Sequence, residues 1–141
     1  MPKELSVFVD NRPGRLRSVA QVLSDSKINV RTMTLQDRGQ YGLMKLIVDK
    51  PEKASLALKD NGFACAVKEI LAIELKDKAG SFLKLADTLT SNKINVEDAY
   101  GFVIESNKRA VFCVEVKDIK KLKSLLKKAG FSVVEEELHK F

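Results

Sequence analysis

The sequence predicts an α+β protein built from two copies of one small βαββαβ unit. Residues 14–30 and 80–96 share seven of their 17 positions, and both segments end in Lys-Ile-Asn-Val. Strand-like and helix-like apolar patterns alternate in the same order around each copy. Because an internal repeat decides architecture before any single residue does, we expect two related halves, residues 1–70 and residues 71–141.

The first repeat opens with a strand and a helix. Leu5, Val7 and Val9 alternate with other residues, which is typical of a strand with one buried face. The turn formers of residues 10–14, Asp-Asn-Arg-Pro-Gly, end that strand. A helix is predicted next, because apolar residues recur at helical spacing at Leu16, Val19, Ala20 and Leu23.

A hairpin and a second helix complete the first repeat. Residues 28–36 are rich in β-branched side chains, and residues 41–49 form the returning strand after a short turn. Pro51 lies in the first turn of the second helix, and Gly62 follows its last turn. Residues 63–70 then form the fourth strand.

The second repeat follows in the same order, without a linker. Its helices are expected around residues 82–89 and 119–129, and its strands at residues 71–75, 96–103, 110–116 and 132–138. The acidic run at residues 135–137 is expected on an edge of the last strand, where charge discourages pairing. His139 is expected at a solvated chain end. The order predicts the ferredoxin-like, split βαβ arrangement: two antiparallel sheets side by side, with the helices on one face.

Composition limits the class of protein. The net charge is +6, from 25 basic and 19 acidic residues that are interleaved in both halves, which favours a solvated surface over a nucleic-acid patch. Cys65 and Cys113 do not correspond between the repeats and are interpreted as packing thiols. The sequence shows no apolar run of about 20 residues and no leader pattern, so we expect a cytoplasmic protein with no membrane partner.

A motif surrounds the glycine that precedes the first helix of each repeat. In the first repeat the loop after the first strand contains Asn11, Pro13, Gly14 and Leu16. In the second repeat the matching positions are Asp77, Ala79, Gly80 and Phe82. In both, Ile-Asn-Val opens the next strand. This pattern resembles the ACT domain, and the resemblance covers essentially the whole chain as two tandem copies.

The resemblance implies a function as well as a fold. ACT domains are regulatory modules that bind small ligands, most often amino acids, where paired domains meet and through the loop after the first strand. Ala79 stands where the first repeat has Pro13, which implies unequal ligand affinity in the two copies.

The chemistry of the two loops agrees with that implication. Gly14 and Gly80 each precede a helix, whose N-terminal N–H groups and partial positive charge attract a carboxylate. Asp10 or Asp77 could pair with an ammonium group, and nearby basic side chains could pair with a carboxylate. The candidate ligand-binding residues are Asn11, Arg12, Pro13, Gly14, Arg15, Leu16, Asp77, Lys78, Ala79, Gly80, Ser81 and Phe82.

Other classes of function are less well supported by the residues. The sequence shows no Ser-His-Asp set, no metal-binding cluster and no phosphate-binding glycine loop, so we expect no enzyme activity, metal or cofactor. The RNA-recognition motif also has βαββαβ order, but it needs exposed aromatic residues on its two central strands. Phe8 fits that requirement, whereas Glu74 takes the matching place in the second repeat and Lys45 and Cys113 occupy the third strands. A protein-interaction adaptor stays open.

The sequence therefore predicts a regulatory sensor that binds a free amino acid at an interface between repeats or chains. The expected partners are the amino acid, a second copy of the chain in a homodimer and, as an open alternative, a metabolic enzyme. Nucleic acid is not among them.

Overall fold

The computed structural model describes residues 1–10 and 12–141. They group into two compact units. The first-repeat unit contains Lys3–Glu69 and also His139–Phe141 from the end of the chain. The second-repeat unit contains Ile70–Leu138 and also Met1–Pro2 from its start. Each unit thus includes a short terminal segment from beyond its own repeat.

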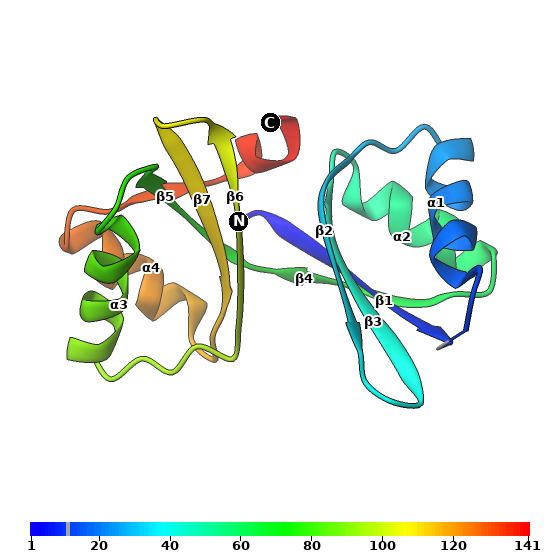
Figure 1. Ribbon diagram of the computed structural model, residues 1–141, viewed down its shortest axis with the longest axis horizontal. Coiled ribbons are helices and arrows are strands. Elements are labelled where there is room, and N and C mark those ends of the chain that lie inside the picture. The colour runs from blue at the N-terminus through cyan, green and yellow to red at the C-terminus, as the bar shows by residue number, and fades with distance from the viewer. Residues whose placement is uncertain (11) are drawn as a thin grey trace. The chain divides into compact units, whose positions relative to one another are not determined.

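The first-repeat unit has βαββαβ order (Figure 1). Its elements are β1 (Lys3–Asp10), α1 (Arg15–Asp25), β2 (Val30–Asp37), β3 (Tyr41–Val48), α2 (Pro51–Asp60) and β4 (Ala64–Glu69). The strands form an antiparallel sheet in the order β2-β3-β1-β4. The predicted ferredoxin-like order is confirmed for this repeat.

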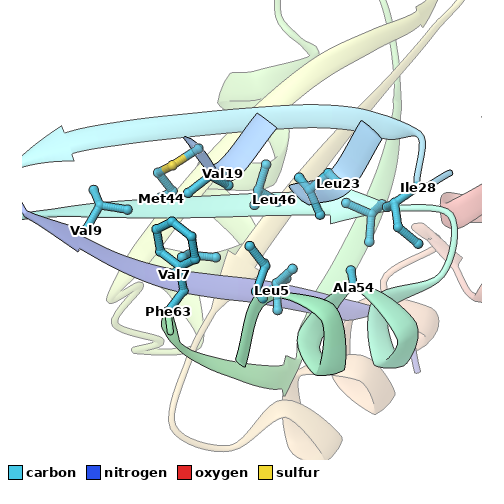
Figure 2. Close-up of a cluster of buried hydrophobic side chains, with 12 residues drawn as sticks. Leu5, Val7, Val9, Val19, Leu23, Ile28, Met44, Leu46, Ala54 and Phe63 are labelled. Carbon is cyan, nitrogen blue, oxygen red and sulfur yellow. The ribbon is translucent and has the colours of Figure 1, made fainter. Parts of the chain in front are cut away.

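One face of this sheet carries the core, and both helices pack on it (Figure 2). Leu5, Val7 and Val9 point from β1 toward the helices, which contribute Val19 and Leu23 from α1 and others from α2. The alternation in β1 therefore has the predicted physical cause, the burial of every second side chain against the helices.

The second-repeat unit repeats this architecture. Its elements are β5 (Leu71–Lys76), α3 (Ser81–Ser91), β6 (Asp98–Glu105), β7 (Arg109–Glu115), α4 (Ile119–Lys128) and β8 (Ser132–Val134), followed by the 3-10 helix η1 (Glu136–Lys140). The sheet order β6-β7-β5-β8 matches that of the first repeat. Only Ile70 separates β4 from β5, and the strands form two separate sheets.

The end of the chain differs from the prediction. β8 stops at Val134, and residues 136–140 form a 3-10 helix instead of continuing the strand to residue 138. The β-branched residues end at Val134, and the glutamates that follow are poor strand formers. The interpretation of the acidic run as a charged strand edge is therefore wrong, because all three glutamates follow the end of β8.

His139 is also not at a solvated end. Only 6% of it is exposed. Its Nδ1 lies 2.7 Å from the Val48 carbonyl oxygen, and its Nε2 accepts a hydrogen bond from the Lys3 N–H at 3.2 Å. A carbonyl only accepts and an N–H only donates, so the ring is neutral with its proton on Nδ1. His139 therefore has a structural role. Its position near the end of the sequence did not indicate that it would be buried.

Candidate functional site

The loop before α3 is held by the neighbouring hairpin. The Asn107 N–H donates to Oδ2 of Asp77 at 2.7 Å, and the Asp77 N–H donates to the Lys108 carbonyl at 3.1 Å. Asp77, which the sequence assigned to a ligand's ammonium group, therefore also fixes the loop to the β6–β7 turn. A carboxylate accepts about four hydrogen bonds, so one such contact leaves capacity for a ligand.

The first turn of α3 follows a backbone that favours glycine. Gly80 is the N-cap residue, with φ of 90°, and no side chain caps the helix. The first turn contains no acidic residue. The positive end of the helix dipole therefore faces the loop without a carboxylate of its own to neutralise it.

A cavity of about 370 Å³ lies between this loop and the strands β6 and β7. We call it the loop cavity; it is lined by Leu75, Lys76, Asp77, Lys78, Ser81, Phe82, Gly101, Phe102, Val103, Ala110 and Phe112. One side thus offers a carboxylate, two ammonium groups and a hydroxyl group, and the other offers aromatic and aliphatic surface. The predicted Asp77, Lys78, Ser81 and Phe82 meet here, while Ala79 and Gly80 form the bend between them.

The strand side of the loop cavity was missed by the sequence analysis. The Phe82 and Phe112 rings lie 5.3 Å apart, and a Cβ added to Gly101 would come within 3.1 Å of the Phe112 ring. Gly101 therefore leaves room for that ring. In the first repeat Leu35 takes the corresponding place, because it pairs with Met44 as Gly101 pairs with Phe112. Only the strand register brings Gly101 and Phe112 to the loop.

A second cavity, of about 480 Å³, lies on the β8 side of the same loop. We call it the basic pocket; it is lined by Glu74, Leu75, Lys76, Lys78, Gly80, Ser81, Lys84, Lys108, Gly130, Phe131 and Ser132. Lys84 Nζ lies 5.6 Å from the centre of the Phe131 ring, which is within the range of a cation–π contact.

The first-repeat loop pairs its charges internally. Oδ2 of Asp10 lies 3.1 Å from Arg12 Nε and 4.0 Å from Arg15 Nε. The Arg15 guanidinium lies 4.8 Å from the centre of the Phe63 ring. Both arginines predicted to meet a ligand carboxylate thus already contact Asp10, beside the exposed Pro13 and Gly14. Asn11, the remaining candidate, lies outside the described residues.

Leu16 and Phe82, two of the candidate ligand-binding residues, are exposed apolar side chains. Leu16 is 44% and Phe82 is 62% exposed, whereas Val19 and Leu85 behind them are buried. The place of Leu16 in the apolar stripe predicted for the first helix therefore does not make it a core residue, and Phe82 is not a core residue either. Phe82 instead forms part of the wall of the loop cavity.

The helix-free faces of the two sheets differ in chemistry. In the first-repeat unit Phe8 and Tyr41 lie 5.8 Å apart between ring centres, each more than 40% exposed. In the second-repeat unit Glu74 takes the place of Phe8 and accepts hydrogen bonds from Arg109, at 3.1 Å from its Nε. This carboxylate raises the pKa of Arg109. The exposed aromatic surface expected of an RNA-recognition motif is therefore limited to one repeat.

Two searches of the described residues gave negative results. They contain no group of three or more metal-ligating side chains. Within the same part of the chain, no helix combines the length and apolar character that crossing a membrane requires.

The duplicated fold and the paired glycine loops agree with a comparison against known families. The family model described as an ACT domain pair matches residues 2–141. The chain is an ACT domain pair. The resemblance seen in the sequence is thereby confirmed, and the chain belongs to this family and not to the RNA-recognition motifs. An ACT pair is a regulatory module and not a catalytic one.

Solved structures share this ACT-pair fold. Protein BT0572 from Bacteroides thetaiotaomicron is 28% identical, with a TM-score of 0.92 over 99% of this chain and 96% of that one. The ligand-free regulatory subunit of aspartate kinase from Thermus thermophilus is 16% identical, with a TM-score of 0.63 over 90% and 91% of the two chains. The corresponding subunit from Thermus flavus is 14% identical, with a TM-score of 0.60 over 91% and 92%. No curated protein matched the sequence.

Proposed function

We propose that this ACT pair senses a free amino acid with an apolar side chain, which binds in the loop cavity of the second repeat. The observation that carries the proposal is the meeting of Asp77, Lys78 and the uncapped start of α3 with the rings of Phe82 and Phe112 around one cavity.

Each part of an amino acid has a matching group in this cavity. Lys78 and the N–H groups at the start of α3 suit the α-carboxylate. Asp77 suits the α-ammonium group while it keeps its contact with Asn107. The aromatic rings of Phe82 and Phe112 suit an apolar side chain, whose burial stabilises the complex.

A thermal-shift screen against the twenty amino acids tests this proposal. A ligand present at about a hundred times its Kd adds roughly 2.7 kcal/mol to the free energy of unfolding, which is readily measured. We expect stabilisation by one or a few apolar amino acids, and titration calorimetry then gives the affinity. No stabilisation by any of the twenty would contradict the proposal.

Two neighbouring exposed residues provide a matched pair of variants. Phe82 and Leu83 are equally exposed, at 62%, but only Phe82 lines the loop cavity. We expect Phe82→Ser to weaken amino-acid binding by about tenfold or more, which corresponds to the loss of about 1.4 kcal/mol of apolar contact. Leu83→Ser should leave the affinity unchanged. Equal effects of the two changes would place the ligand elsewhere.

The downstream partners belong to the same proposal. A sensor of this kind acts by favouring one conformational population, and a metabolic enzyme is the partner class that the family suggests. We also propose that the protein forms a homodimer and is located in the cytoplasm. Light scattering coupled to size-exclusion chromatography, with and without the amino acid, measures the oligomeric state directly.

A further inference from the structure

The two repeats differ in charge at matching positions around their first loops. Asp10, the last residue of β1, corresponds to Lys76 at the end of β5. In the first repeat the Asp10 carboxylate forms ion pairs with Arg12 and Arg15. In the second repeat this position itself carries a positive charge, and the acidic residue, Asp77, follows it.

The basic pocket is lined by several lysine side chains. Lys76, Lys78, Lys84 and Lys108 all line it. Its acidic lining residue, Glu74, is engaged by the guanidinium of Arg109, and Lys108 has a single ion pair with Glu105 at 3.2 Å. Within the described part of the chain, Lys76 and Lys78 make no ion pair.

An aromatic ring in each repeat lies beneath a cation, and in the second repeat this ring lines the basic pocket. Phe63 and Phe131 follow matching glycines, and each contacts a cation, Arg15 in the first case and Lys84 in the second. Arg15 stands at the position of Ser81 and is paired with Asp10, whereas the smaller Ser81 lines an open cavity of about 480 Å³. Ser81 therefore lacks the guanidinium that Arg15 places over the Phe63 ring.

We infer that the basic pocket binds a small molecule that carries a phosphate group. Apart from Lys108, which pairs with Glu105, three ammonium groups line the cavity, and a single carboxylate cannot neutralise them. A phosphate has about two negative charges and three strong acceptor oxygens. The site goes beyond the proposed amino-acid function, because the lysines at positions 84 and 108 line the basic pocket and not the loop cavity.

Titration of the full chain with pyrophosphate at constant ionic strength tests the inference. We expect saturable binding by calorimetry, with the backbone amide signals of residues 76–84 shifting in NMR spectra. Succinate, an anion without phosphate, should bind much more weakly. Equal binding of succinate would overturn the assignment to phosphate, and an effect reproduced by sodium chloride alone would overturn the site.

Matched double variants separate a built site from general charge. Lys84→Gln with Lys108→Gln should weaken pyrophosphate binding by about tenfold or more, because two favourable charge contacts are lost. Lys120→Gln with Lys128→Gln removes the same charge from exposed positions of α4 outside the pocket, and binding should stay within about twofold. Equal losses in the two double variants would overturn the proposal.

The same variants distinguish this inference from the proposed function. Phe82 does not line the basic pocket, so Phe82→Ser should leave pyrophosphate binding unchanged while it weakens amino-acid binding. Lys84→Gln with Lys108→Gln should have the opposite selectivity. Loss of both ligands in either variant would show that the two cavities are one site and would overturn the separate phosphate pocket.

Discussion

At the scale of single residues, the glycine before each first helix is required by the backbone. Gly14 and Gly80 both have φ of 90°, in the left-handed region, and a Cβ added to either would meet nothing within 4 Å. Their requirement is therefore conformational and not steric. An L-residue with a side chain in this left-handed region destabilises the fold by about 1–2 kcal/mol, and a β-branched side chain is the worst case.

Gly80→Val tests this requirement. We expect a loss of about 2 kcal/mol in the free energy of unfolding of the second-repeat unit, together with loss of amino-acid binding as the loop shifts. Chemical denaturation and calorimetry measure the two effects. Gly80→Asn is the control, because asparagine tolerates the left-handed region. This variant should retain most of the stability and most of the amino-acid affinity. If valine left the affinity intact, this loop would not bind the ligand.

At the scale of elements, all four helices end in the same hydrogen-bonded turn. The residue after each C-cap has positive φ, and the next N–H donates to a carbonyl five residues back, as from Ile28 to Leu23. This is the Schellman motif, which normally uses glycine. Gly62 and Gly130 follow α2 and α4, but Lys27 and Lys93 follow α1 and α3 with φ of 57° and 55°. The repeated Lys-Ile-Asn-Val thus closes the last turn of a helix with its Lys and Ile and leads into the next strand.

Lys27→Gly should therefore stabilise the protein. Glycine removes the left-handed strain of about 1–2 kcal/mol but loses about 0.5–1 kcal/mol of conformational entropy, so we expect a net gain of up to about 1 kcal/mol. The Lys27 side chain is exposed, so little else changes. Thermal or urea denaturation measures the gain. Lys27→Ala keeps a Cβ and should give none; equal stabilisation by alanine would show that the charge mattered and not the backbone.

The contact between α4 and the residue after β8 makes stability depend on pH. The hydrogen bond from Lys123 holds the pKa of Glu135 below its ordinary value of 4.5, and the N-terminal ammonium group adds to this effect. A lowered pKa means that the contribution is present above the pKa of the unfolded state. It is lost as the pH falls through the lower pKa of the folded state.

Glu135→Gln should remove that pH dependence. We expect a loss of less than about 1 kcal/mol at neutral pH, because the pair is partly solvated, and no difference from the parent protein at pH values below the folded-state pKa. Urea denaturation at several pH values measures it. Glu97→Gln, which changes an exposed carboxylate before β6, should leave the profile as it is. A parallel offset at every pH would contradict the ionic explanation.

At the scale of the whole molecule, each repeat is completed by the far end of the chain. His139 binds the Val48 carbonyl and the Lys3 N–H, and Arg31 Nε donates to the His139 carbonyl at 3.0 Å. At the other end, the Met1 ammonium group lies 3.4 Å from Glu136, and the Pro2 carbonyl accepts from the Ile70 N–H. A repeat cut out at the boundaries of the sequence duplication would lack these contacts.

Removal of residues 139–141 should therefore weaken the first-repeat unit. The three hydrogen bonds of His139 are lost, and we expect their loss to cost about 1–3 kcal/mol in its free energy of unfolding. Hydrogen exchange should show faster exchange of the Lys3 amide, whose acceptor is gone. Removal of residues 140–141 alone keeps His139 and should have a smaller effect. Unchanged exchange at Lys3 in both would contradict the anchoring role of His139.

The sequence alone determined the duplicated architecture and the position of the two glycine loops. Apolar periodicity and the turn residues are local properties, so the βαββαβ order and the loops that contain Gly14 and Gly80 could be predicted from short segments. The residues around Gly14 and Gly80, with the Ile-Asn-Val that follows each helix, then gave the resemblance to the ACT domain.

The tertiary structure alone decided which groups meet those loops. Gly101 and Phe112 reach the loop cavity through strand register, and Lys108 reaches the basic pocket through the β6–β7 turn that Asp77 holds. His139 is buried by residues about ninety or more positions away. Such contacts depend on how distant strands pair and pack, and no local pattern in the sequence records that pairing.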